Sequence, residues 1–449
     1  MDIVIMVGQL ILGLSILVIL HEFGHFIAAR AFGIKVEKFY LFFDAWNVSL
    51  FKFNYKGVEY GMGWLPLGGY VKIAGMIDES MDTEQMAGPP QPWEFRSKPA
   101  WQRLIVMLGG IFVNIVLGVL IFWVLTIKYG ESYIPNDSVK YGIVPGTIGR
   151  DIGLKAGDKI LAVNGQKLVR FEEVISSKVL MGNSTLNVQR GPQALDIKVP
   201  GSILNEISDL GSEAFISRMP RTTFMVDTVV AGSSAQKAGL LHADSVVAVN
   251  GKPIHFYDEF QAELQQYKNK PVGLTIKRGE STLPLTAQVN KDGMLGFADG
   301  RYGIRVKTDL PQEKTLKFGF FGSLPVGASR AWGTFSDNAK GLGKVFTGQV
   351  KANKALSSPI GIARLFGTHI DWFRFWSLVG LLSMALALMN LLPIPALDGG
   401  HALFLIIEMI KGKPLSDRFL ERAQVVGFVI LVTLMVFVFG NDIIKLMKK

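Results

Sequence analysis

The sequence predicts a membrane α-helical protein with four transmembrane helices and a soluble α+β insertion between the second and the third. Hydrophobic residues make up 49% of the 449 residues, and the mean hydropathy is +0.31. Charged residues avoid four long apolar segments, each long enough to cross or nearly cross a bilayer core. Residues 128–373, by contrast, have a largely soluble composition and contain an internal repeat.

The first apolar segment runs from residue 3 to about residue 29 and carries the motif H-E-F-G-H at residues 21–25. On a helix, His21 and His25 lie one turn apart on the same face, so both imidazoles can reach one metal ion. Glu22 points to a neighbouring sector, from which it can act on a metal-bound water without being a ligand. Ionisable groups at membrane depth are costly and usually functional, which favours a metal site over a pair of surface histidines at a helix end.

The loop after this segment is expected to form a membrane-associated β-hairpin. Within residues 57–73, large side chains alternate with other residues from Val58 to Trp64, and the turn-forming run at 66–69 follows. We expect a turn there, beside a strand edge that can pair with an extended peptide, so Gly68 and Gly69 are candidate substrate-binding residues. An ordinary cytoplasmic hairpin is the alternative.

Three further apolar segments cover about 104–127, 375–392 and 425–439. Basic residues concentrate in the loop between the first and second segments and in the short loop between the third and fourth. The positive-inside rule places both loops in the cytoplasm and both termini outside, although the basic C-terminal tail argues mildly against this. These flanks account for the net charge of +10, so no nucleic-acid partner is expected. The absence of cysteine excludes cysteine zinc sites, thiol catalysis and disulfides.

Two stretches of the soluble region, residues 146–168 and 232–254, align without gaps. The pattern predicts a short helix, a Gly-Leu cap, a tight Asp turn, a strand and an Asn-Gly hairpin turn. It resembles the core of PDZ domains, whose A-G-L-x-x-G-D-x-I-x-x-V-N-G stretch it nearly reproduces. Residues 302–304 are a faint candidate for a carboxylate-binding loop, so the two copies either bind peptide ends or act as spacers. They share Gly153/Gly239, Leu154/Leu240, Asp158/Asp244, Ala162/Ala248, Val163/Val249, Asn164/Asn250 and Gly165/Gly251.

The third apolar segment ends in the motif N-L-L-P-I-P-A-L-D-G-G-H, residues 390–401. Its two prolines interrupt the helix before Asp398, which is tolerable where protein or a watery cavity satisfies the freed backbone groups. Asp398 is expected at the same membrane depth as the two histidines. A carboxylate that joins two imidazoles leaves a fourth position open for water, which is the pattern of catalytic zinc sites. His401 is the rival third ligand, and is otherwise expected to support a ligand.

These motifs, in this order around the repeats, resemble the site-2 protease family, and within it the bacterial regulator-of-sigma-E type. The resemblance implies a metallopeptidase with one Zn²⁺ per chain, held by His21, His25 and Asp398, with Glu22 as the general base. It implies that substrate transmembrane segments are cut near the cytoplasmic side. The residues that it assigns to substrate binding are Asn390, Pro393, Pro395 and Asn114. The family's G-P-x-x-N reads Gly110-Ile111-Phe112-Val113-Asn114 here, so the proline is absent and the local helix geometry is in question.

The resemblance also implies a setting and partners. The protein is expected in the bacterial inner membrane, with the PDZ-like pair and both termini in the periplasm. Its expected substrates are single-pass membrane proteins of the anti-sigma-factor kind, cut beforehand by a site-1 protease during the envelope stress response, with remnant signal peptides as a further class. Membrane lipid is the other expected partner. The predicted divisions are 1–127 (helices 1 and 2), 128–220 and 221–309 (PDZ-like domains), 310–373 (an amphipathic linker) and 374–449 (helices 3 and 4).

Two other classes of function compete with proteolysis. A membrane metal transporter predicts more intramembrane carboxylates and inverted repeats, which this chain lacks. A non-catalytic PDZ scaffold is disfavoured because Glu22 and the whole expected ligand set are present.

Overall fold

The computed structural model describes residues 2–76, 88–229, 231–295, 297–298, 301–302, 304–350 and 359–447. The chain divides into two compact units. The helical unit comprises Met1–Glu131 and Leu316–Lys449, and the insert unit comprises Ser132–Thr315. The candidate loop at Gly303 lies outside the described residues.

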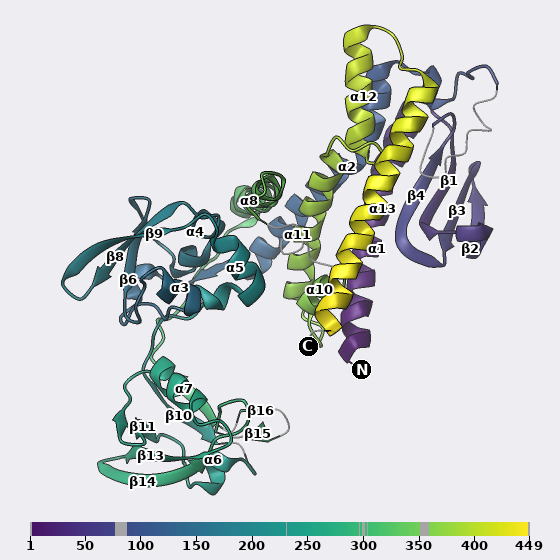
Figure 1. Cartoon of the computed structure of the whole chain (residues 1–449). Coiled ribbons are helices and arrows are strands. Elements are labelled where there is room, and N and C mark those ends of the chain that lie inside the picture. Colours follow the sequence, from purple (N-terminus) through teal and green to yellow (C-terminus); the bar gives the residue numbers. More distant parts are fainter. Residues whose placement is uncertain are drawn as a thin grey trace. The chain divides into compact units, whose positions relative to one another are not determined.

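The four predicted apolar segments are confirmed as helices long enough and apolar enough to cross a membrane. Helices α1, α2 and α11 pack together (Figure 1). Helices α1 and α2 approach closely where Gly24 faces Gly109. A Cβ atom on either glycine would overlap the backbone of the other helix, so the small residues permit this packing. The four helices are α1 (Asp2–Ala31), α2 (Ala100–Tyr129), α11 (Trp372–Leu391) and α13 (Asp417–Met447).

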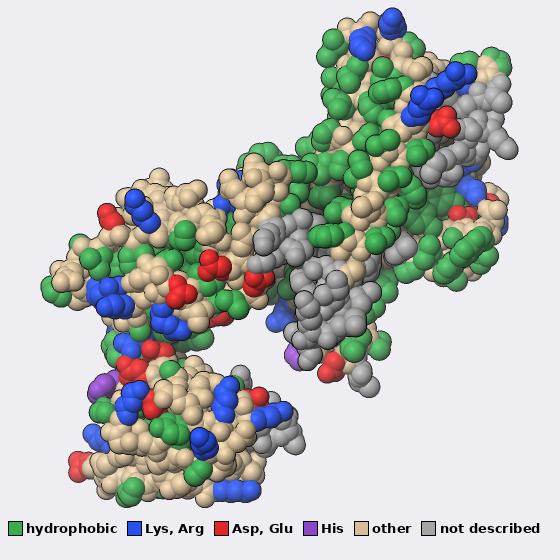
Figure 2. Space-filling view, viewed as in Figure 1, with side chains coloured by type: hydrophobic (Ala, Val, Ile, Leu, Met, Phe, Trp, Pro, Cys, Tyr) green, Lys and Arg blue, Asp and Glu red, His purple; other side chains and the backbone are tan. Residues whose placement is uncertain are grey.

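Among its described residues, the helical unit contains three further α-helices: α8 (Phe320–Phe346), α10 (Pro359–Phe366) and α12 (Asp398–Lys411). Helix α8 packs on α2, where Trp123 Nε1 donates to the Phe320 carbonyl at 2.9 Å. Helix α12 follows α11 after the proline-containing loop 392–397 and packs against α2. An ion pair between Arg103 and Glu408 joins α2 to the C-terminal part of α12. Hydrophobic side chains cover much of the surface of this unit, as expected of helices that face lipid (Figure 2).

A four-stranded sheet follows α1, and it corrects the predicted hairpin. Its order is β2-β3-β1-β4, so β1 lies between β3 and β4. The residues at 66–69 lie within β4 rather than in a turn, and the hairpin actually joins β2 to β3 through Lys56 and Gly57, both with positive φ. The chain passes from β3 to β4 around the end of β1, where Trp64 Nε1 donates to the Ala45 carbonyl. The strands are β1 (Val36–Phe43), β2 (Ser49–Tyr55), β3 (Val58–Gly63) and β4 (Leu65–Ile73).

The insert unit contains two four-stranded sheets with the same antiparallel arrangement, β7-β6-β8-β9 and β12-β11-β13-β14. Each sheet has its own buried apolar core. The first copy comprises α3 (Thr147–Asp151), β6 (Lys159–Val163), β7 (Gln166–Lys167), α4 (Ser177–Leu180), β8 (Ser184–Arg190), β9 (Gln193–Val199) and α5 (Ile203–Leu210). The second comprises β10 (Phe224–Val229), α6 (Ser234–Lys237), β11 (Ser245–Val249), β12 (Lys252–Pro253), α7 (Tyr257–Gln265), β13 (Pro271–Arg278) and β14 (Ser281–Gln288). The described residues also form three two-stranded pairs: β10 with β17 (Ile304–Thr308), β15 (Phe297–Ala298) with β16 (Arg301–Tyr302), and, at the limits of the insert unit, β5 (Glu131–Tyr133) with β18 (Lys314–Leu316).

The repeated Asp turn is held in both copies by an arginine from the following hairpin. In the second copy, Arg278 donates from Nε and Nη2 to the two carboxylate oxygens of Asp244 at 2.8 Å each. Arg190 makes the matching pair of bonds to Asp158 in the first copy. Burial alone would raise the pKa of Asp244, but the Arg278 guanidinium and the Leu241 N–H hold that pKa below its usual range.

Candidate metal centre

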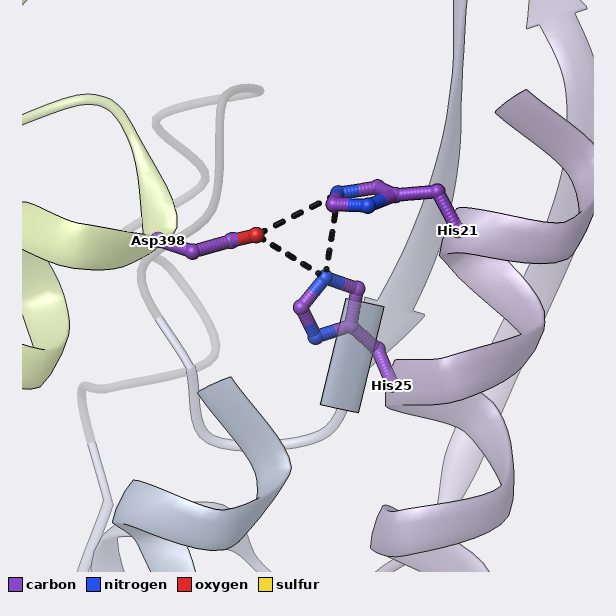
Figure 3. A group of neighbouring side chains, drawn as sticks. All are labelled: His21, His25 and Asp398. Carbon is purple, nitrogen blue, oxygen red and sulfur yellow. Dashed lines mark hydrogen bonds and ion pairs between the residues drawn. The ribbon is translucent and has the colours of Figure 1, made fainter. Parts of the chain in front are cut away.

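Two helices that are far apart in sequence bring His21, His25 and Asp398 together (Figure 3). The histidines lie one turn apart on α1 and are 8% and 6% exposed. Asp398 opens α12. Its Oδ2 atom lies 3.2 Å from His21 Nε2 and 3.3 Å from His25 Nε2, and the two Nε2 atoms are 3.4 Å apart. Among the residues that the structure describes, these three form the only such cluster of metal-ligating side chains.

The spacing of the three atoms fits one tetrahedral metal ion. Ligands about 2.0–2.1 Å from zinc at tetrahedral angles are separated by roughly 3.3–3.4 Å, which is close to the three distances observed. The buried Oδ2 of Asp398 also finds no hydrogen-bond donor among the described groups. A buried carboxylate oxygen without a donor is costly, and a cation at this point would remove that cost.

The backbone of α2 fixes the orientation of His25. Its Nδ1 donates to the Val106 carbonyl at 2.8 Å, and a carbonyl can only accept. The proton of the neutral ring is therefore on Nδ1, which leaves the lone pair of Nε2 directed at His21 and Asp398. This is the usual way in which a protein sets the tautomer of a metal-binding imidazole.

Asn114 performs a similar task for His21. This asparagine of α2 is fully buried, and its amide lies 3.0 Å from His21 Nδ1, the ring nitrogen that does not face Asp398. Its Oδ1 has no partner among the described groups, and turning the amide would let Oδ1 accept the Nδ1 proton. Ser383 of α11 holds the Asn114 backbone by donating to its carbonyl at 2.7 Å. Asn114 is a predicted substrate-binding residue, and the structure places its amide against His21.

The proline that the family motif has at position 111 is not needed for this contact. Helix α2 runs unbroken through Ile111, which is 4% exposed, and still delivers Asn114 to His21. Gly110 makes room for both imidazoles, because a Cβ atom there would overlap His25 Nε2 and His21 Cε1. The glycine of the motif is therefore the residue that the histidines require at this point.

Four further candidate residues lie close to Asp398 in the sequence, and the structure gives each of them different neighbours. Asn390, in the last turn of α11, places Nδ2 3.2 Å from His21 Nε2, at the edge of the cluster. Pro393 is exposed in the loop, and the backbone of Pro395 packs against α13. His401 is separate from the metal-ligating cluster and faces Gln424 of α13.

Strand β4 runs beside the turn of α1 that carries Glu22. A Cβ atom at Gly69 would lie 2.7 Å from Val18 Cγ1 and 3.6 Å from Glu22 Cγ, so the glycine lets the strand approach Glu22. Gly68 is covered by the ring of Phe43. β4 is an outer strand of its sheet and pairs only with β1 among the described strands.

Two groups that contact histidines of this region, the Val106 carbonyl and Gln424, are not among the predicted site residues. The Val106 carbonyl is a backbone group, for which the sequence carries no signal. Gln424 comes immediately before the predicted fourth run at about 425–439, whereas the structure includes it in the apolar helix Arg418–Phe437. A single amide at the edge of an apolar run could have marked it, since polar groups at membrane depth are usually functional.

Comparisons with known proteins agree with this geometry. Residues 9–434 match the family model described as peptidase family M50. The chain is similar to the regulator of sigma-E protease RseP of Salmonella typhimurium, with 32% identity over 97% of this chain and 98% of the relative. It is 30% identical to the protein of the same name from Escherichia coli, over 98% of each chain, and 30% identical to a zinc metalloprotease of Vibrio cholerae, over 97% of this chain and 98% of the relative.

The family match covers most of the chain, and the relatives are matched over almost their whole length. The four apolar helices and the cluster of two histidines and one aspartate are what a zinc-dependent protease of the membrane requires. The chain therefore belongs to peptidase family M50, the site-2 proteases, and is an intramembrane zinc metalloprotease.

Proposed function

We propose that His21, His25 and Asp398 hold the zinc ion and that Glu22 is the general base for peptide cleavage. The observation that carries the proposal is the mutual distance of the three ligand atoms, 3.2–3.4 Å, in a buried site. Two neutral nitrogens and one carboxylate leave a fourth position for water, as catalytic zinc sites require. His401 is not part of this proposed set, because it faces α13.

Each residue near the cluster has a distinct task in this proposal. Bound zinc supplies positive charge and a water that loses its proton near neutral pH. Glu22 takes that proton and returns it to the leaving amine. Asn390, at the edge of the cluster, donates a hydrogen bond to the scissile carbonyl oxygen as negative charge develops on it. The Val106 carbonyl and Asn114 keep the two imidazoles in the orientation that presents Nε2 to the metal.

The substrate segment must be extended at the point of cleavage, because a helix hides its carbonyl groups. We propose that it pairs with the outer edge of β4 at Gly68 and Gly69, beside Glu22. Pro393 and Pro395 keep the loop before Asp398 out of helical geometry, and we propose that this loop borders the bound segment. At the opposite edge of the sheet, β2 exposes Leu50, which fits contact with membrane lipid.

We propose that the two sheets of the insert unit are PDZ-like domains on the periplasmic side, with both termini, and that the metal lies near the cytoplasmic side of a bacterial inner membrane. Support comes from the repeated motif, the matching strand orders and the basic loops of the sequence. The domains would then exclude substrates that still carry a bulky periplasmic part. The relatives are named as regulators of sigma-E, so the proposed substrates are single-pass anti-sigma-factor-like proteins that another protease has already shortened.

The variant Glu22→Gln tests the chemistry. It should keep zinc, because Glu22 is not a proposed ligand, and should lose cleavage by several orders of magnitude, because glutamine cannot accept the proton. Cleavage of a short transmembrane substrate by the purified protein in detergent, with zinc content measured in parallel, provides both readouts. Turnover close to that of the wild type would refute the role of Glu22.

A further inference from the structure

Helix α13 is the least buried of the four spans, with 11% of its apolar window buried. Among its side chains whose exposure is described, only Gln424, at 5% exposure, and Gly427 are buried. Three residues apart on a helix, they lie on one face. Gln424 faces His401, and Gly427 faces the peptide between Pro395 and Ala396. The packed face of α13 is therefore a small one, directed at the proposed metal ligand.

The first contact is polar. Gln424 lies against the His401 imidazole as a hydrogen-bond partner, and His401 lies in the first turn of α12, one turn after Asp398. A buried amide is costly unless it is paired, and this one is paired within the protein. The pair therefore connects α13 to the end of α12 that carries the carboxylate.

The second contact is between backbones. A Cβ atom at Gly427 would overlap the Pro395 carbonyl and lie 3.0 Å from Ala396 N. Ala396 has a φ of 110°, a conformation that an L-residue adopts only when its surroundings enforce it. Because Gly427 has no side chain, the backbone of α13 contacts this strained peptide directly, two residues before Asp398.

We infer that Gln424 and Gly427 are positioning residues for the metal centre: α13 contributes no ligand, but it sets the position of the Asp398 carboxylate. This inference rests on the proposed role of Asp398 as a zinc ligand. It makes zinc affinity depend on the packing of a helix that is otherwise exposed to lipid. Arg103 and Glu408 join the far end of α12 to α2, and α13 contacts the near end.

Zinc affinity of the purified full chain, measured against a graded chelator, tests this inference. Gln424→Leu and Gly427→Ala should each weaken zinc binding about 10- to 100-fold, the usual effect of losing a group that supports a ligand. Gln424→Leu leaves the His401 imidazole without this partner, so the folding of each variant is checked by circular dichroism before zinc is titrated. Gln424→Glu keeps an oxygen acceptor for His401 and should recover most of the affinity. The matched control is Val426→Ala, at a neighbouring position that is 56% exposed, which should bind zinc like the wild type.

The outcomes separate this inference from the proposed function. If Asp398→Ala loses zinc while Gln424→Leu and Gly427→Ala bind it with wild-type affinity, the positioning role is wrong and the ligand set stands. If Asp398→Ala keeps zinc, the ligand set itself is wrong, and the inference falls with it. A lower melting temperature of the zinc-free protein in Gln424→Leu, without a change in zinc affinity, would mean that the contact is only structural.

Discussion

Gly110 offers the sharpest test of how tightly α2 confines the two imidazoles. In Gly110→Ala, the added methyl group would stand 2.5 Å from His21 Cε1 and 2.7 Å from His21 Nδ1, whereas ordinary contact begins at 3.4 Å. The methyl group belongs to a helix backbone that packs closely on α1 at Gly24 and Gly109, so α2 cannot easily retreat. The imidazoles must therefore move.

The size of that movement sets the expected effect. Restoring ordinary contact requires a displacement of roughly 0.7–0.9 Å, whereas zinc–ligand distances tolerate about 0.2 Å. We therefore expect zinc affinity to fall more than about 100-fold, beyond the 10- to 100-fold loss typical of a missing supporting group. Alanine is the better helix former by roughly 0.5–1 kcal/mol, so a loss of helix stability is not the expected cause.

Chelator competition on the purified variant, with circular dichroism to verify folding, measures this effect. The matched control is Gly118→Ala on the same helix, where the methyl group would meet the flexible end of Met384 instead of a metal ligand. That control should keep wild-type zinc affinity, because Met384 is buried in the helix core and is not one of the proposed ligands. If Gly110→Ala also binds zinc like the wild type, the imidazoles are not confined as the structure indicates.

Two further predictions concern the insert unit. Deletion of residues 139–306 should preserve zinc binding and cleavage of a short-tailed substrate, and should also allow cleavage of the substrate that still carries its periplasmic part. If the deletion abolishes cleavage of the short substrate and allows no new substrate, the unit recruits substrates instead of excluding them. Because the pKa of Asp244 is lowered in the folded state, its stabilising contribution is complete above its ordinary pKa of about 3.9 and is lost as the pH falls through the folded value. Acid titration of the full chain, followed by melting of the insert unit, should show a fall in stability below about pH 4 that is weaker in Asp244→Asn, and identical profiles would contradict this.

The sequence was sufficient wherever a feature depends on local pattern. Apolar length marked the four spans, because crossing a bilayer needs about 20 residues whatever the fold. The H-E-F-G-H spacing placed His21 and His25 on one helix face, and Asp398 completed the cluster as expected. Each of these follows from helix geometry or from the chemistry of a donor set.

Apart from the approach of Asp398 to the two histidines, pairing between distant segments was beyond the sequence. Alternation in residues 57–73 indicated strands, but it could not reveal that β1 would enter between β3 and β4. The packing of α2 on α1 directs Asn114 to His21 Nδ1, a contact for which single-sequence patterns carry no signal. Gln424 meets His401 only because α13 packs against the loop before Asp398, and the sequence does not reveal that packing. In all three cases tertiary packing, and not local preference, decides the contact.

The identity of the third ligand is the central claim, and zinc stoichiometry in two variants tests it most directly. The purified wild type should hold one zinc per chain. Asp398→Ala should lose it almost completely, because only two imidazoles remain, whereas His401→Ala should retain zinc at saturating metal with reduced affinity. Full zinc occupancy in Asp398→Ala together with loss of zinc in His401→Ala would contradict the account and identify His401 as the ligand.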